Sequence, residues 1–301
     1  MSLTVVGSIA LDTVETPLGK AEEILGGAAV FFSLAAAHFC RVNLIGVVGK
    51  DFPEEHAQLL SSRNINMDGL ERADGKTFRW SARYHDDINE RDTLDTQLNV
   101  LESFQPKLTQ TSTEAPYLFL ANIHPSLQLD VLNQSKPVFV GLDSMNLWID
   151  IAPDMLKQVL KKIDCLVIND AEARQLTGEN NLPVAARHIQ NLGPATVIIK
   201  KGEHGCLLFG KDGQIFAAPA IPLDRVIDPT GAGDTFAGGF MGYIADKGNS
   251  DWATLKQAVV HGTVLASFAC ESFGPDSLAT IGKDDINKRI QLFSELTHFT
   301  S

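Results

Sequence analysis

The fold of this chain is decided by one stretch, Asp228-Pro229-Thr230-Gly231-Ala232-Gly233-Asp234. Its proline and two glycines interrupt regular secondary structure. Residues 235–244, which follow, are apolar or small on every side of a helix, and this predicts a buried helix. The sequence therefore predicts a tight glycine loop that opens directly into a buried helix.

This loop has the features of an anion site. The backbone N–H groups of residues 231–234 are expected to lack helical partners, and they lie at the positive end of the helix dipole. Such a helix start binds phosphate groups. A carboxylate at Asp234 would repel a bound anion, which makes sense if Asp234 accepts a proton from a group that attacks that anion. The pattern favours phosphoryl transfer to a hydroxyl, although a simple N-cap would also explain Asp234 alone.

The longer run, residues 228–240, resembles the C-terminal signature of the ribokinase-like (PfkB) family of carbohydrate and nucleoside kinases. The resemblance implies that Asp234 is the catalytic base. It implies that Gly231, Ala232 and Gly233 hold the γ-phosphate, and that Thr230 contributes to nucleotide binding.

Composition excludes several other classes of protein. Of the 301 residues, 44% are hydrophobic and 21% charged, which is typical of a globular domain. The formal net charge is −12 without any long basic cluster, which argues against nucleic acid and anionic membranes as partners. No apolar run reaches the roughly 18 residues of a membrane span. Strand-like sequence from Leu3 leaves no room for a signal peptide, and the four cysteines are widely spaced, so we expect a cytoplasmic protein.

Two N-terminal motifs are candidates for the acceptor site. Residues 3–10 read as a buried strand, and Asp12 follows it, where ligands bind in α/β sheets; a turn-capping role is equally compatible. Gly26 and Gly27 open an Ala-rich helix, either to let a ligand approach or merely to form a tight turn. In the family, the matching Asp binds substrate hydroxyls and the matching Gly-Gly joins a lid to the body.

The chain departs from the ribokinase pattern just after these glycines. Phe31 and Phe32 stand where ribokinases carry an Asn. Phe31 is a candidate for stacking on a base or on the apolar face of a sugar, and burial in the core is the alternative. The two aromatic residues favour a nucleoside acceptor.

The pattern of apolar and polar residues changes between residues 75 and 100. Residues 77–84 alternate between apolar and polar, and residues 91–100 are polar and Thr-rich, which predicts a half-exposed antiparallel pair. With residues 11–25, this pair matches the small β-sheet lid of the ribokinase-like fold. The resemblance implies that the lid excludes water during transfer, and that its exposed face can form a homodimer.

Between these parts, strands alternate with helices, which is typical of a parallel sheet. Asn122 and Asp143 lie at carboxyl ends of predicted strands and are candidates for the substrate pocket. His124 could act as a base, but we expect a pocket or structural role because Asp234 already has that function. Asp51 is predicted to cap a helix that begins near Glu54.

Two further motifs point to the nucleotide. Asn169 and Glu172 lie three residues apart in a first helical turn, and could order the waters around a cation; a dipole effect alone also places acids there. In the family, this pair orients Mg²⁺ and the phosphates. A strand at 196–200 then ends on a motif that the family places along the nucleotide, and the candidates for binding it are Lys200, Lys201, Gly202 and Gly205. A solvated lysine pair is the alternative for the two lysines.

The C-terminal third completes the chain. Residues 206–218 predict a hairpin with an Asp-Gly turn, residues 252–271 a helix, and residues 284–299 a closing amphipathic helix.

We expect a single domain over residues 1–301, a ribokinase-like three-layer α/β/α sandwich with a mostly parallel sheet and a β lid. The expected activity is transfer of the γ-phosphoryl group of ATP, with Mg²⁺, to a small sugar or polyol; a nucleoside is the alternative acceptor. A non-catalytic ligand sensor is the rival, but it would be marked by loss of Asp234 or of the loop glycines, which are present.

Overall fold

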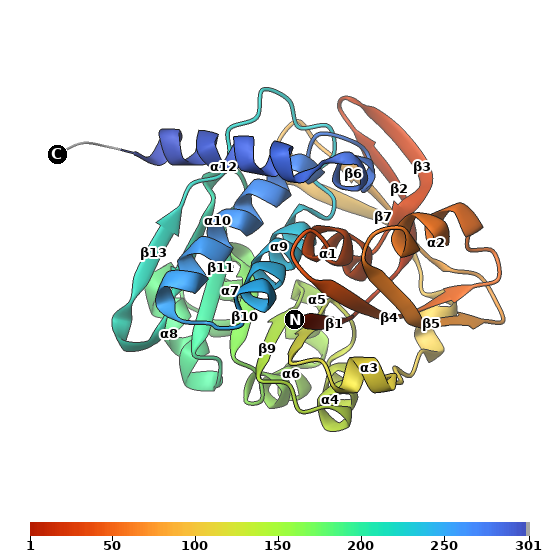
Figure 1. Ribbon diagram of the computed structural model, residues 1–301, viewed down its shortest axis with the longest axis horizontal. Coiled ribbons are helices and arrows are strands. Elements are labelled where there is room, and N and C mark those ends of the chain that lie inside the picture. Colours follow the sequence, from red (N-terminus) through yellow and green to blue (C-terminus); the bar gives the residue numbers. More distant parts are fainter. Residues whose placement is uncertain (299–301) are drawn as a thin grey trace.

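The computed structural model describes residues 1–298, and its core is a nine-stranded sheet (Figure 1). The strand order is β13-β12-β11-β10-β9-β8-β1-β4-β5. All neighbours pair in parallel except β11–β12 and β12–β13, which are antiparallel. The strands are β1 Ser2–Val6, β4 Arg41–Gly49, β5 Ile65–Ala73, β8 Tyr117–Leu120, β9 Phe139–Asp143, β10 Cys165–Asn169, β11 Thr196–Lys200, β12 Cys206–Phe209 and β13 Ile215–Ala218. The predicted mostly parallel sheet is confirmed.

Helices cover both faces of this sheet, and each layer closes its own apolar core. One core joins the sheet to α1 Ala28–Ala36, α2 Glu54–Ser61, α9 Ala232–Lys247, α10 Trp252–Ala269, α11 Asp276–Thr280 and α12 Lys283–Thr297. The other joins it to α4 Pro125–Gln134, α5 Asn146–Ile151, α6 Pro153–Leu160, α7 Asp170–Thr177 and α8 Leu182–Leu192. A short helix, α3 Gln110–Thr113, precedes β8. Strands buried on both faces by helices form a three-layer α/β/α sandwich, as the sequence predicts.

A second, four-stranded sheet lies at one side of the molecule, where β2, β3 and β7 are labelled beyond α1 in Figure 1. Its order is β3-β2-β6-β7, with β2 Ala10–Thr16, β3 Gly19–Gly26, β6 Phe78–Tyr84 and β7 Arg91–Gln97. The predicted antiparallel pairing of the last two strands is confirmed. These strands fall in the two segments for which the sequence predicts a lid. Opening and closing of this small sheet over a substrate remain a prediction.

Helix α9 explains why the chain folds around its signature. Ten of its residues, from Thr235 to Ala245, are buried, because apolar and small side chains occupy every side of it. It packs between α1 and α10, at the centre of the helical layer (Figure 1). Its first turn therefore lies over the carboxyl ends of the parallel strands, where polar groups gather.

The predicted helix cap at Asp51 is wrong. Asp51 does not cap α2, because the helix begins at Glu54 and its N-cap is Pro53. The Asp51 carboxylate instead accepts hydrogen bonds from the amide and hydroxyl of Thr77, at 2.7 and 2.8 Å. The closing helix is confirmed as α12, although Phe299, its expected last residue, lies outside the described residues. None of the helices within residues 1–298 is long and apolar enough to cross a membrane.

Candidate active site

The glycine loop begins α9 through a tight turn. Gly231 adopts a left-handed conformation, with φ 75° and ψ 0°. The Ala232 amide donates to the Pro229 carbonyl at 3.2 Å, and the Thr235 amide donates to Gly231 at 2.8 Å. The expectation that all four amides of residues 231–234 lack partners is therefore wrong for Ala232. Within residues 1–298, no carbonyl accepts from the amides of Gly231 and Gly233, so these donors remain available at the helix start.

Phe31 lies under this loop. A Cβ at Gly231 would overlap the Phe31 ring, and only 1% of Phe31 is exposed. Phe32 is equally buried, and it stacks on Phe119 with ring centroids 4.4 Å apart. The ring of Phe31 therefore packs against the glycine loop, residues 228–234, and has almost no free surface for an acceptor. Its stacking on a substrate stays a prediction.

Asp234 belongs to a group of charged side chains that come from four separate elements. The ammonium of Lys200, at the end of β11, lies 3.0 Å from Oδ2 of Asp143, at the end of β9. The same ammonium lies 2.9 Å from the point where a Cβ on Gly233 would stand, directly beside the anion loop. Lys200 also acts electrostatically on Asp234 and on Glu172 of α7. The structure thus brings together four predicted site residues that lie far apart in the chain.

Burial makes the carboxyl groups of Asp234 and Glu172 harder to ionise. It raises the pKa of Asp234 to about 7, with a further contribution from the charge on Asp143, while Lys200 partly offsets both. Burial and Asp143 likewise raise the pKa of Glu172 to about 7. A carboxylate with a pKa near neutrality is a stronger proton acceptor than an ordinary one. Burial, which residue spacing alone does not reveal, thus makes Asp234 a stronger base than an exposed carboxylate.

Asn169 and Glu172 form a capping box at the start of α7. Asn169 Oδ1 accepts from the Glu172 amide at 2.8 Å, and Glu172 Oε2 accepts from the Asn169 amide at 3.0 Å. Each side chain keeps one polar atom outside this box, namely Nδ2 of Asn169 and Oε1 of Glu172. The cap therefore fixes the two side chains and leaves one group on each to face water or a ligand.

A second pair of buried carboxylates, Asp12 and Asp228, lies at the N-terminal motif. Burial and the charge on Asp228 raise the pKa of Asp12 to about 8, and a hydrogen bond from the Gly27 amide opposes this. Gly27 has φ 95°, and a Cβ there would lie 2.8 Å from the Ala10 amide nitrogen. A Cβ on Gly26 would overlap the Asp12 carboxylate itself. The double glycine is therefore required for the chain to pass beside Asp12, which is 4% exposed.

Asn122 and His124 have partners of their own. Asn122 Oδ1 accepts from Nε1 of Trp148 at 2.8 Å, and its Nδ2 contacts Sδ of Met145 at 3.2 Å. His124 is the N-cap of α4, and its ring packs edge-on against Trp148. Both residues thus hold the segment that follows β9. Contact of Asn122 with a substrate stays a prediction.

The remaining nucleotide candidates lie at the edge of the site. The Lys201 amide donates to the Gly205 carbonyl at 2.7 Å, which closes a short turn between β11 and β12. Gly202 is exposed on that turn, and Asn89 from the loop between β6 and β7 lies against it. The small sheet therefore reaches the turn on which the sequence places the nucleotide.

Sequence reasoning missed two residues of the small sheet. The Thr230 hydroxyl donates to the Tyr84 hydroxyl at 3.2 Å, although these residues lie 146 positions apart. Arg91, opposite Tyr84 in the strand pairing, acts electrostatically on Asp234 and Glu172. The alternation of residues 77–84 predicts a strand, but it does not reveal which loop the inner face of that strand meets.

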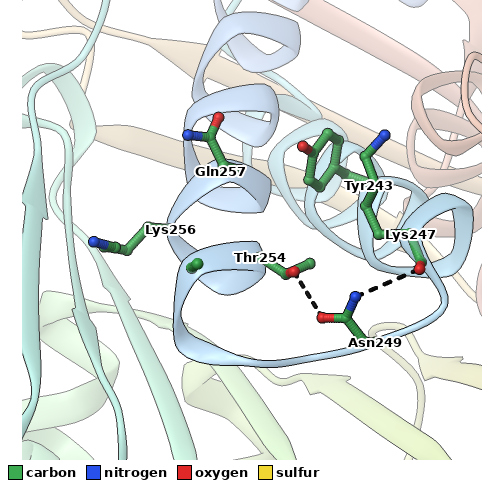
Figure 2. A pocket seen from close by; sticks show the side chains of 7 residues that line it. Tyr243, Lys247, Asn249, Thr254, Lys256 and Gln257 are labelled. Atoms are coloured by element: carbon green, nitrogen blue, oxygen red, sulfur yellow. Dashed lines mark hydrogen bonds between the residues drawn. The ribbon is translucent and has the colours of Figure 1, made fainter.

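A shallow pocket elsewhere is unrelated to this chemistry. It has a volume of about 260 Å³ and lies between the end of α9 and the start of α10 (Figure 2). Its lining includes Tyr243, Lys247, Asn249, Thr254, Lys256 and Gln257. The dashed bonds in Figure 2 tie Asn249 to Thr254 and to the Lys247 carbonyl, closing the turn between the helices. Asp234 stands at the opposite end of α9.

Comparison with known proteins agrees with this geometry. Residues 2–281 match the family model described as pfkB family carbohydrate kinase. The cytidine kinase of Thermococcus kodakarensis is 31% identical over 248 residues, which cover 80% of this chain and 87% of that protein.

Two solved structures share the fold. The aminoimidazole riboside kinase of Salmonella enterica, complexed with aminoimidazole riboside and an ATP analog, has a TM-score of 0.76 at 20% identity, covering 96% of this chain and 100% of that one. The nucleoside kinase of Methanocaldococcus jannaschii has a TM-score of 0.77 at 21% identity, covering 97% and 98%. With the signature loop, the charged cluster and the family match in agreement, the chain belongs to the pfkB family of carbohydrate kinases.

Proposed function

We propose that this kinase uses ATP as its phosphoryl donor and a nucleoside as its acceptor. The observation that carries the acceptor is the 31% identity to a cytidine kinase over most of both chains. A neighbour in fold is complexed with a riboside and an ATP analog, which supports the same pair of substrates. This choice adopts the nucleoside alternative of the sequence analysis in preference to the sugar or polyol.

The reaction assigned to Asp234 is proton acceptance. As the acceptor oxygen bonds to the γ-phosphorus, the bond from phosphorus to the β–γ bridging oxygen breaks, ADP leaves, and the hydroxyl proton passes to the Asp234 carboxylate. A pKa raised to about 7 suits this carboxylate to the task at neutral pH. Asp12, with Gly26 and Gly27 beside it, would hold the acceptor.

The residues present fit the phosphate groups of a nucleoside triphosphate. The free amides of Gly231 and Gly233 would donate to the transferred phosphoryl group, and the Lys200 ammonium lies beside them. Mg²⁺, when bound, would neutralise charge on the phosphates. No group of three or more His, Cys, Asp or Glu side chains in residues 1–298 could hold a metal ion directly. We therefore assign Asn169 and Glu172 to hold Mg²⁺ through water, using the atoms that their capping box leaves outside.

A sugar or polyol acceptor is the second candidate, favoured by the description of the family as carbohydrate kinases. Both candidates share the proton acceptor and the anion loop. They differ in the chemical group that would contact Asp12.

The test is ATP-dependent release of ADP against a panel of nucleosides, pentoses, hexoses and inositols with Mg²⁺. We expect turnover with one or more nucleosides. The Asp234→Asn protein should lose turnover by several orders of magnitude and keep its affinity for ATP. Asp246→Asn is the matched control, because Asp246 lies on the same helix near its other end and pairs with Lys247.

Each outcome decides a different part of the proposal. Turnover only with sugars would replace the nucleoside by the second candidate. Near-normal turnover in Asp234→Asn would remove the proton acceptor. Equal losses in the two variants would point to damage of α9 rather than to chemistry.

We also keep a homodimer through the small sheet as a proposal. All seven residues of its edge strand β7 are exposed, and Leu94 on it is 51% exposed. Light scattering at several protein concentrations would test it.

A further inference from the structure

Arg91 stands on the face of the small sheet that meets the signature loop. It is the first residue of β7, and it pairs with Tyr84 in the register of β6 and β7. Its guanidinium carbon lies 5.4 Å from the centroid of the Trp80 ring. Trp80 and Tyr84 lie four residues apart on one strand, so their side chains share a face. Arg91 therefore lies on the same face as Tyr84.

This face is docked on the nucleotide side of the site. The Tyr84 hydroxyl accepts from Thr230 at 3.2 Å, four residues before Asp234. Asn89, two residues before Arg91, lies against Gly202. The end of the β6–β7 hairpin is thus fixed between the signature loop and the turn after β11, with Arg91 directly beside Tyr84.

The charges around Arg91 call for an anion. Burial and Asp143 raise the pKa of Asp234, and the positive charges of Lys200 and Arg91 partly offset this effect. Glu172 shows the same pattern, with the same two cations in opposition to burial. Among residues 1–298, Lys200 is the one cation of the main sheet seen to act on all three carboxylates, Asp143, Glu172 and Asp234, while a nucleoside triphosphate would add several negative charges. An additional cation must balance them.

Arg91 is available for that role. No carboxylate of residues 1–298 forms an ion pair with it, whereas Arg83 on the neighbouring strand pairs with Glu15 at 3.1 Å. A planar guanidinium donates two parallel hydrogen bonds to phosphate oxygens, which a lysine cannot do.

We propose that Arg91 is a substrate-contacting residue that the small sheet delivers to the phosphoryl group, where its guanidinium donates to γ-phosphate oxygens and balances their charge during transfer. This rests on the proposed function for the identity of the donor. The contact links closure of the small sheet to catalysis, because the cation reaches the phosphates only when Tyr84 and Thr230 are in contact. It also explains how a site with three carboxylates accepts a polyanion.

The test compares nucleotides with and without the γ-phosphate. Calorimetric titration uses an ATP analogue with a β,γ-imido bridge, and ADP as the ligand without the γ-phosphate, both with Mg²⁺. Arg91→Met should bind the analogue about tenfold more weakly and ADP about as well as the parent protein does. Arg91→Lys should recover part of the loss, since it restores the charge without the fork. Arg83→Met is the control, and we expect both affinities to be unchanged.

Two further readouts separate a phosphate contact from a structural role. The emission of Trp80 should change when the analogue draws the guanidinium away from its ring, and this change should be absent in Arg91→Met and with ADP. Turnover in Arg91→Met should fall about a thousandfold. Its thermal midpoint should stay within about 2 °C of the parent, because Arg91 is an exposed residue without an ion pair in the described chain.

Equal weakening of the binding of the analogue and of ADP would overturn the proposal, and so would an unchanged affinity for the analogue. If no acceptor in the panel is phosphorylated, the proposed function fails. The titrations then still decide whether Arg91 contacts a γ-phosphate.

Discussion

The ammonium of Lys200 lies 3.0 Å from the carboxylate of Asp143, across the strand β10 that separates them in the sheet. Both side chains are largely buried, at 17% and 7% exposure. The pair lies beside the glycine loop, and after burial its two charges have the next largest effects on the pKa of Asp234, which Asp143 raises and Lys200 lowers. Loss of this ion pair should therefore alter the ionisation of Asp234 more than it alters the fold.

Replacement of Lys200 by Met should move the pH profile. Lys200 lowers the pKa of Asp234 and of Glu172, so its loss should raise both. We expect the acid limb of kcat/KM to shift upward by about one pH unit or more, with turnover at pH 7 reduced about tenfold or more. Rates measured from pH 5.5 to 9.5 test this. Lys211→Met, on an exposed turn, should leave the profile unchanged, and a profile of unaltered midpoint in Lys200→Met would contradict the prediction.

The parent enzyme should show its own acid limb near neutrality. The pKa of Asp234 is raised to about 7, first by burial, and only the ionised form can accept a proton. We expect kcat/KM to rise with pH through about 7 and then to level off. A rate that is already constant at pH 5.5 would mean that Asp234 ionises like an exposed carboxylate.

Asp12 should make the stability of the protein depend on pH. Its pKa is about 8 in the folded protein against an ordinary 3.8, first because of burial, so between these values the folded state holds a proton that the unfolded state has lost. The free energy of unfolding therefore falls as pH rises from about 4 to 8. Asp12→Asn removes this pH-dependent contribution to stability. The melting temperature of Asp12→Asn minus that of the parent should therefore increase by about 2 °C or more from pH 5 to pH 8.5.

The control for this experiment is Asp154→Asn, whose side chain is 92% exposed. Its melting temperature should follow that of the parent at every pH. A constant offset between Asp12→Asn and the parent would show that Asp12 ionises alike in both states.

Gly231 and Gly178 offer a comparison of two left-handed glycines. Their φ angles are 75° and 73°, but a Cβ on Gly231 would overlap the Phe31 ring, while nothing lies within 4 Å of one on Gly178. Gly178→Ala should destabilise the protein by about 1 kcal/mol through backbone strain alone. Gly231→Ala should cost about 1–3 kcal/mol more through the clash. Urea unfolding measures both.

The clash can be isolated by a second substitution. Phe31→Leu should be less destabilising in the Gly231→Ala background than in the parent, because a smaller side chain makes room for the methyl group. Additive effects of the two changes would show that Phe31 does not limit the space at the loop.

Local patterns in the chain are sufficient to predict the elements that depend on neighbouring residues. The glycine loop and the buried helix at 232–247 follow from proline, glycine and an all-round apolar pattern. The double glycine before helix α1, the alternating strand β6 and the run of buried strands follow from equally local patterns. Even the capping box of Asn169 and Glu172 is contained within four residues.

Which distant side chains meet depends on how the whole chain folds. Strand β5 lacks a clear periodicity, and it forms because it pairs with β4. Asp51 leaves its predicted cap because Thr77 and Arg79, far along the chain, offer it three donors. Phe31 turned out to support the anion loop for the same reason, since its burial depends on where Gly231 comes to rest.

The charged site shows most clearly which features local sequence patterns leave undetermined. Lys200 and Asp143 lie 57 residues apart, and Thr230 and Tyr84 lie 146 apart. Strand order and register bring these pairs together, and burial then raises the pKa of Asp234 and of Asp12. Residue types and spacing specify a group that can carry a charge, whereas its distance to other charges and to water, which fixes its chemistry, exists only in the folded chain.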